Sequence, residues 1–149
     1  MTAQEFSEQV RQNKDRLWRI SYSILKNGAD CDDALQEALL RAWKQIGSLR
    51  DERYFTTWLT RILINECKRI LKRGKLQPLP EHLPEEQNTD GSDLRDAILA
   101  LPLNLRIPLV LHYIEGYPVR HIAAMLRLPE TTVNWRLHSA RKQIRDEWN

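Results

Sequence analysis

The side chains best suited to chemistry lie near the C-terminus of this 149-residue chain, between positions 126 and 145. Asparagine and arginine can each form paired hydrogen bonds with the edge of a DNA base, and cationic side chains contact phosphate. This stretch holds both types, and Glu130 is its only acidic residue. The candidate contacts to DNA are Thr131, Thr132, Asn134, Trp135, Arg136, His138 and Arg141.

An amphipathic helix would position these side chains. Apolar residues recur here at the spacing of one helix face, which predicts a buried stripe. They are Val133, Leu137, Ala140 and Ile144. At about 100° per residue, the candidate contacts fall opposite this stripe or on its flanks. A polar face exposed only to solvent is the commoner explanation for such a pattern. Trp135 favours a partner, because a large aromatic side chain is costly to leave in water.

The segment before this helix predicts a helix-turn-helix. Pro118 is well placed to open a helix after a turn at Gly116 and Tyr117. The apolar face of that helix consists of Val119, Ile122, Ala123 and Leu126. A tight turn at Arg127 and Leu128 then leads into the basic helix. This order is typical of a helix-turn-helix, whose second helix fits the major groove of DNA.

A second cationic patch lies earlier in the chain. Between positions 54 and 75 the basic residues are Arg61, Lys68, Arg69, Lys72, Arg73 and Lys75, and Glu66 is the only acidic one. Positions 76 to 93 hold no lysine or arginine but several carboxylates. The formal net charge of +3 is modest, so the segregation of charge is more informative than its sum. It indicates two surfaces for a polyanion, separated by an acidic spacer.

The elements that carry these patches are all predicted to be helical. We expect a short opening helix, a helix ending at Asn27 and Gly28, a helix over about 29–47 and another over about 54–73. Further helices are expected over about 93–101 and about 103–115, with Pro108 near the first turn of the latter. The segment 76–92 contains prolines and glycine without a helical stripe, which indicates a flexible linker. The sequence therefore predicts an all-α protein with small helical domains at 1–75 and 93–149, joined by 76–92.

Several classes of function have no support in the sequence. We find no nucleophile and base pair, no cluster of metal ligands and no glycine loop for phosphate, so we expect no enzyme, metal or cofactor. Cys31 and Cys67 lie within helical patterns and are expected to be buried and reduced. The N-terminus has no secretory signal, and no apolar run approaches the roughly 20 residues of a membrane span. We therefore expect a cytoplasmic protein without membrane insertion.

Taken together, these segments resemble the extracytoplasmic-function (ECF) sigma factors of bacterial RNA polymerase. The resemblance covers nearly the whole chain, in the family's order of region two, linker and region four. One matching element consists of Asp33, Gln36, Glu37, Arg41 and Trp43. A second consists of Phe55, Thr57, Trp58, Leu59, Arg61, Ile62 and Asn65. The segment 101–141 is similar to region four from end to end.

The resemblance implies a role for each set of residues. Asp33, Gln36, Glu37, Leu40 and Arg41 would dock on the clamp helices of the largest subunit of core RNA polymerase, and region four would meet the flap. In the downstream promoter element, a flipped base would meet Arg50, Tyr54 and Asn65, while Arg61, Lys68, Arg69, Lys72 and Arg73 would follow the DNA backbone. Phe55 and Trp58 are expected to support the core. The face with Trp135 would read the upstream element, and an anti-sigma factor is an expected partner.

Some residues depart from the family pattern. Arg127 stands where the turn usually has glycine, and a left-handed conformation there would cost about 1 to 2 kcal/mol. Asn134 and Trp135 stand where relatives often have lysine and serine. The promoter sequence of relatives therefore does not transfer to this chain.

Two other functions remain open on the sequence alone. A stand-alone helix-turn-helix repressor or activator would bind its operator tightly without polymerase, as a symmetric dimer. A helical scaffold or inhibitor would instead bind a protein through Trp135, and would tolerate charge reversal at Arg136 and Arg141.

Overall fold

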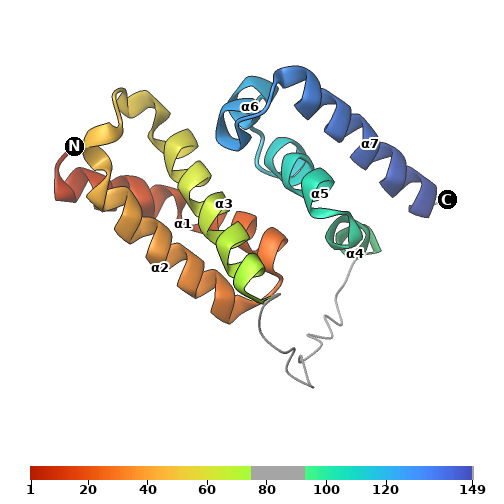
Figure 1. Ribbon diagram of the computed structural model, residues 1–149, viewed down its shortest axis with the longest axis horizontal. Coiled ribbons are helices and arrows are strands. Elements are labelled where there is room, and N and C mark those ends of the chain that lie inside the picture. Colours follow the sequence, from red (N-terminus) through yellow and green to blue (C-terminus); the bar gives the residue numbers. More distant parts are fainter. Residues whose placement is uncertain (75–92, 149) are drawn as a thin grey trace.

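The computed structural model describes residues 1–74 and 93–148 of the chain. Their secondary structure is entirely helical, which confirms the predicted all-α class (Figure 1). The helices form one group before position 75 and a second group after position 92. The predicted linker 76–92 lies outside the described residues.

The first group consists of α1 (Ala3–Leu25), α2 (Gly28–Lys44) and α3 (Phe55–Gly74). Single turns of 3-10 helix at Ile46–Ser48 and Glu52–Tyr54 connect α2 to α3. The prediction of a separate opening helix was wrong, because α1 is continuous over 23 residues. No glycine or proline interrupts it, and the Asn13 side chain donates to the Gln9 carbonyl one turn earlier at 2.8 Å. Asn13 therefore satisfies its amide within the helix and does not end it.

The chain turns sharply between α1 and α2. Lys26 adopts a left-handed conformation with φ 59°, and Asn27 caps the start of α2 by accepting from the Asp30 amide at 3.1 Å. The predicted break at Asn27 and Gly28 is confirmed, but Gly28 is the first residue of α2 rather than the end of α1. The asparagine side chain explains the difference, since it is a strong N-cap.

The second group consists of α4 (Asp93–Ala100), α5 (Leu103–Leu109), α6 (Val119–Leu126) and α7 (Glu130–Trp148). A π-helical turn, Val110–Ile114, continues α5 directly. The prediction that Pro108 lies near the first turn was wrong, because α5 already begins at Leu103. Proline has no amide hydrogen for the helical ladder, and the helix widens just after it, where the Glu115 amide donates to the Val110 carbonyl at 3.0 Å.

The predicted helix-turn-helix is formed by α6 and α7. Arg127 occupies the turn in the left-handed region with φ 54°, and the Leu128 amide donates to the Ala123 carbonyl at 3.0 Å, which closes the end of α6. Three members of the predicted apolar stripe of α7 are buried: Val133 and Ala140 are fully covered and Leu137 is 3% exposed. The fourth, Ile144, is partly buried. The opposite face of α7 therefore points to solvent.

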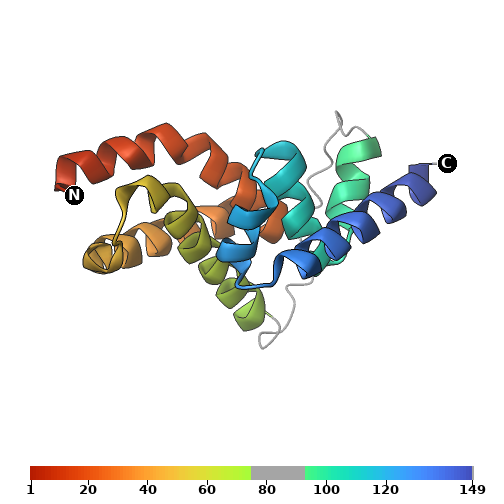
Figure 2. The ribbon, with the colours of Figure 1, turned by 90° about the horizontal axis from the view of Figure 1, so that it is seen from above.

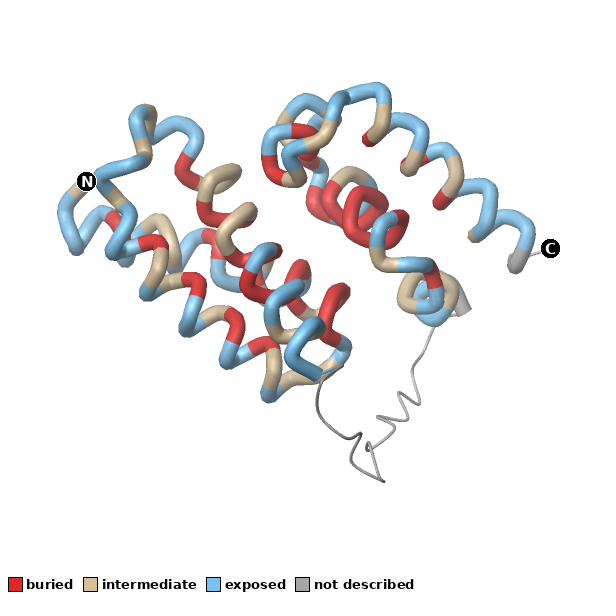
Figure 3. The backbone as a smooth tube through the Cα atoms, viewed as in Figure 1, coloured by how far each residue is buried: buried red, intermediate tan, exposed pale blue. Residues whose placement is uncertain are grey.

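The two groups pack against each other along α1, α3, α5 and α6 (Figures 1 and 2). The main apolar core is continuous across them, and includes Leu17, Ile20 and Leu63 from the first group and Ile107, Leu111 and Ile122 from the second. Buried residues accordingly gather on the facing sides of the helices (Figure 3). Both cysteines are buried in the first group, as predicted. None of the described helices is long and apolar enough to cross a bilayer.

Candidate nucleic-acid interface

The outer face of α7 exposes most of the predicted upstream contacts. Trp135 is 66% exposed, and Thr131, Asn134, His138 and Arg141 are also exposed, while Thr132 and Arg136 are partly covered. A tryptophan so exposed on a helix with a buried opposite side has no packing role within the described chain. The face offers an aromatic ring, an amide and cations to a partner.

The two arginines on the flanks of this face have different surroundings. The Arg141 guanidinium donates to the hydroxyl of Tyr113 and lies over the same ring, 5.8 Å from its centre. Arg136 lies on the side toward the first helical group, where it lines a cavity of about 390 Å³ together with Lys68 of α3. The structure thus brings an upstream and a downstream candidate to the same cavity.

The predicted DNA contacts of α3 divide into two sets. Arg61, Asn65, Lys68 and Lys72 follow one another at the spacing of a single helix face. We call these four residues the α3 stripe. Arg69 and Arg73 lie to one side of it, and Arg69 approaches the buried carboxylate of Glu66 at 3.6 Å. The stripe therefore forms a narrow polar track that runs beside the second helical group.

A cavity of about 420 Å³ lies at the start of α3 and is lined by Arg50, Tyr54, Trp58 and Arg61, together with Ala124 of α6. The Tyr54 ring is 52% exposed at its mouth. Phe55 is 1% exposed, as expected of a core support. Asn65 does not line this cavity, so the structure does not bring its amide to Arg50 and Tyr54. The arrangement places two aromatic rings and two guanidinium groups around a space of base size.

Asp51 also lines this cavity, and its side chain is fixed by its neighbour. Its carboxylate accepts from the Arg53 guanidinium at 2.8 Å and from the Arg53 amide at 3.0 Å. These hydrogen bonds lower the pKa of the Asp51 carboxyl, and the side-chain bond contributes most. Asp51 therefore remains charged and caps the turn before α3.

The predicted docking residues share the outer face of α2. Asp33, Gln36, Glu37 and Leu40 are exposed, and Leu40 is 55% exposed although it is apolar. Arg41 differs from them, because its guanidinium lies 2.5 Å from the Glu66 carboxylate of α3. Glu66 is 4% exposed, so Arg41 also neutralises a buried charge. The α2 face thus presents an apolar side chain surrounded by polar ones.

A polar cluster between the two groups was not found from the sequence. Arg19 of α1 donates to both carboxylate oxygens of Glu115 at 2.8 and 3.0 Å, and Arg16 approaches the same carboxylate at 3.5 Å. Arg16 also donates to the Tyr117 hydroxyl at 3.2 Å. The two arginines and their partners are about a hundred positions apart in the chain. No local pattern could therefore have indicated the cluster.

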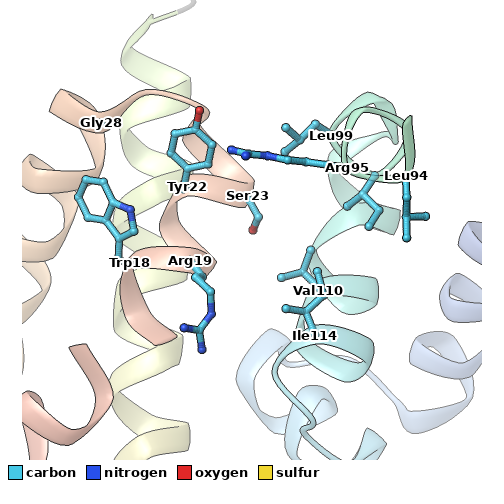
Figure 4. Close-up of a pocket in the computed structure, with 11 residues that line it drawn as sticks. Trp18, Arg19, Tyr22, Ser23, Gly28, Leu94, Arg95, Leu99, Val110 and Ile114 are labelled. Atoms are coloured by element: carbon cyan, nitrogen blue, oxygen red, sulfur yellow. The ribbon is translucent and has the colours of Figure 1, made fainter. Parts of the chain in front are cut away.

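An apolar cavity of about 660 Å³ lies next to this cluster, between α1 on one side and α4 and the π turn on the other. Trp18 and Tyr22 face Leu99, Val110 and Ile114 across it (Figure 4). Within residues 1–74 and 93–148, no three histidine, cysteine, aspartate or glutamate side chains are placed to hold a metal ion.

Comparison with known proteins assigns the two helical groups. Residues 9–76 match the family described as Sigma-70 region 2, and residues 92–144 match Sigma-70, region 4. The ECF RNA polymerase sigma factor SigM of Mycobacterium tuberculosis is 31% identical over 146 residues, which cover 93% of this chain and 74% of the relative. The RNA polymerase sigma-E factor of Streptomyces coelicolor is 32% identical over 151 residues, covering 96% and 85%. The chain belongs to the ECF sigma factors.

Other relatives agree with this family membership. SigE of Mycolicibacterium smegmatis is 32% identical over 156 residues, and the match spans 95% of this ECF chain but 60% of that relative. Among solved structures, the sigma factor RpoE in complex with the anti-sigma factor NepR from Bartonella quintana superposes with a TM-score of 0.79 at 21% identity, covering 97% and 96% of the two chains. CnrH in complex with the cytosolic domain of CnrY gives a TM-score of 0.75 at 21% identity, covering 99% and 89%. These two structures share the fold.

ECF sigma factors are alternative sigma factors of transcription initiation, and the family consists of DNA-binding regulators rather than catalysts. In this ECF chain, α1 to α3 correspond to region 2 and α4 to α7 to region 4. The α3 stripe thus belongs to region 2, and the Trp135 face to region 4.

Proposed function

We propose that this chain directs core RNA polymerase to promoters with two recognition elements, at minus 35 and minus 10, and aids melting of the downstream one. The observation that carries the proposal is the presence of two cationic faces with exposed aromatic rings, one on each helical group. Trp135 is 66% exposed on α7 and Tyr54 is 52% exposed before α3. The polymerase would supply the catalysis.

The Trp135 face would read the upstream element in the major groove. Asn134 and Arg136 have side chains that form paired hydrogen bonds with adenine and guanine edges. Trp135 offers apolar contact to a thymine methyl, while Thr131 and Arg141 suit phosphate. Because Arg141 is already held by Tyr113, its guanidinium is preorganised on the flank of the face.

The cavity at the start of α3 would hold an unpaired base of the downstream element. Stacking on an aromatic ring and contact with a guanidinium plane are the usual means of holding an extruded base, and Tyr54, Arg50 and Arg61 provide both. Lys68 and Lys72, further along the α3 stripe, would follow the phosphates of the separated strand. Arg69 would do so from beside the stripe, where its ion pair with Glu66 at 3.6 Å is long.

The exposed face of α2 would dock on the clamp helices of the largest polymerase subunit. Leu40 gives that face an apolar centre, and Asp33, Gln36 and Glu37 surround it, an arrangement common in interfaces between proteins. Region 4 would meet the flap. The chain would act in the cytoplasm, where its polymerase is, and an anti-sigma factor would restrain it. The structure of RpoE in complex with the anti-sigma factor NepR supports such a partner.

Transcription with purified core polymerase on a library of genomic fragments tests the proposal. New start sites should appear only when the chain is added, and they should share two sequence elements at a fixed spacing. Those elements would also reveal the promoter preference of the Trp135 face.

Two results would contradict it. Tight binding of a palindromic site by a dimer, without polymerase, would indicate a stand-alone regulator. Unchanged cellular function after charge reversal at Arg136 and Arg141 would indicate a scaffold that has no use for DNA.

A further inference from the structure

Glu66 is the one acidic residue of α3, and it is buried. Its side chain is 5% exposed. Helices α2 and α3 pack against each other, and the residues that they contribute to the apolar core include Ala38, Leu63 and Cys67. Replacing a buried ion pair with apolar side chains is often neutral or stabilising. Stability alone therefore does not account for a carboxylate at this position.

The Glu66 carboxylate pairs with Arg41 of the proposed docking face. The Nε atom of Arg41 lies 2.5 Å from Oε1 of Glu66, and it is shielded from solvent without being aligned for a hydrogen bond. The contact is therefore an attraction between charges. The Arg41 side chain is nevertheless 38% exposed, so its exposed part lies among the methylene groups and the two terminal nitrogens. The guanidinium is anchored on its Nε side, and the terminal nitrogens remain as donors for a partner.

Arg69 is a weaker partner of the same carboxylate. Its Nη1 atom lies 3.6 Å from Oε1 of Glu66, and its side chain is 51% exposed. Attraction between charges falls with distance, so Arg41 is the principal partner of Glu66.

Without Glu66, Arg41 would have an alternative partner on its own helix. Glu37 lies four positions before Arg41, and opposite charges at this spacing attract each other along a helix surface. In the structure Arg41 pairs across to α3 instead, while Glu37 is exposed. One buried carboxylate therefore helps to keep two charges of opposite sign available on the α2 face.

We propose that Glu66 is a positioning residue for polymerase docking, which holds Arg41 in the docking face of α2 and away from Glu37. Glu66 would not touch the polymerase itself, because its side chain is buried. The part concerning the polymerase rests on the function proposed above, whereas the hold of Glu66 on Arg41 does not.

The affinity of the labelled full chain for purified core polymerase, measured by fluorescence anisotropy, tests the proposal. Glu66→Gln should weaken binding at least about fivefold, since only a minor fraction of the chains would then present Arg41 correctly. In the background of Arg41→Gln, Glu66→Gln should weaken binding no further, because Glu66 acts through Arg41. A role of Glu66 in helix packing alone would instead give the same loss in both backgrounds.

Two matched controls accompany these variants. Glu8→Gln removes an exposed carboxylate of α1, and Ser23→Ala removes a buried hydrogen bond of 2.6 Å within α1. Both should bind polymerase as the unaltered chain does, and far-UV circular dichroism verifies that every variant remains helical. The Nε–H signal of Arg41 in two-dimensional NMR reports the hold directly. It should shift and broaden in Glu66→Gln but in neither control.

An unmoved Arg41 signal in Glu66→Gln would overturn the proposal, and so would an equal loss of affinity in both backgrounds. Unchanged affinity of Glu66→Gln, where Arg41→Gln does weaken binding, would also overturn it. If the signal moves but Arg41→Gln binds polymerase normally, the proposed docking role of Arg41 fails while the hold of Glu66 on Arg41 stands.

Discussion

Trp135 is the most unusual residue on the outer face of α7. It is the most exposed large hydrophobic side chain among the described residues. An exposed aromatic ring beside an amide and a guanidinium suits contact with base edges and methyl groups. Its contribution should therefore appear in DNA binding rather than in stability.

We expect Trp135→Ala to weaken binding of the holoenzyme to the upstream element by about 1 to 3 kcal/mol. The free energy of unfolding should change by less than about 0.5 kcal/mol, because the side chain makes few contacts within the chain. Gln143→Ala, an exposed change on the same helix beyond this face, is the matched control. Electrophoretic mobility shift and urea unfolding measure the two quantities. A loss of stability equal to the loss of affinity would contradict the assignment.

Cys67 makes the stability of the protein depend on alkaline pH. Burial raises the pKa of its thiol from 9.0 to about 12. As pH rises from 9 toward 12, the unfolded thiol ionises while the native one stays protonated, so the stabilising contribution that is complete below pH 9 is lost across this window. The slope is at most about 1.4 kcal/mol per pH unit.

The variant Cys67→Ala should therefore be less stable than the unaltered chain near neutral pH, because it leaves a cavity. Between about pH 8 and about pH 10 it should lose roughly 1 kcal/mol less of its stability than the unaltered chain does. Urea unfolding at the two pH values gives this difference, and other titrating groups cancel in the comparison. Parallel pH profiles would show that the native thiol ionises normally.

At the scale of the elements, the turn between α6 and α7 contains a residue in an unfavourable backbone conformation. Arg127 has a Cβ in a left-handed conformation that glycine adopts without strain. Arg127→Gly should raise the free energy of unfolding by about 0.5 to 1 kcal/mol, because the relief of strain exceeds the entropy that glycine adds to the unfolded chain. Lys142→Gly, in the regular part of α7, should lower it by about 1 kcal/mol. Thermal unfolding distinguishes the opposite signs.

The outer face of α2 gives a second prediction at this scale. Glu37→Lys should abolish co-purification with core polymerase, since it reverses a charge next to Leu40 in the proposed docking face, without a change in the helical signal. Glu8→Lys, an exposed carboxylate on α1 rather than α2, is the control and should have little effect. Retention of Glu37→Lys by the polymerase, to the same degree as the control, would remove α2 from the interface.

Local patterns in the sequence were sufficient for most of the helices. The stripe of Val133, Leu137 and Ala140 was predictable because its members are separated by single helical turns, and all of them are buried. The continuous α1 and the π turn after Pro108 were not predictable. Asn13 satisfies its amide within its own helix, and the consequences of a missing amide at Pro108 depend on the packing around it.

For the whole molecule, the packing of the two groups was beyond the reach of sequence patterns. Arg19 and Glu115 are 96 positions apart, and charges at such separation carry no periodicity. Arg41 shows the same effect within one group, because its ion pair with Glu66 joins two helices. The proposed surfaces on α3 and α7 could be identified one at a time from the sequence, whereas the cavity that Lys68 and Arg136 share could not.

Arg106 gives a prediction about the stability of the whole molecule. It is 6% exposed, and its guanidinium donates to the carbonyls of Leu99 and Leu101 at 2.8 and 3.2 Å, besides that of Ile24. Arg106→Met would fill similar space but leave these acceptors unpaired. We expect a loss of about 2 to 3 kcal/mol in the free energy of unfolding, measured in urea. An unchanged stability would mean that water replaces the arginine at no cost.

The Arg16, Arg19 and Glu115 cluster also has a consequence for protein engineering. Chimeras that join region 2 of this chain to region 4 of a relative will pair a foreign residue with the two arginines. If that residue is apolar, both cations lose their counter-ion at a shared surface. Functional domain exchange among ECF sigma factors will then require positions 16, 19 and 115 to be transplanted as a set.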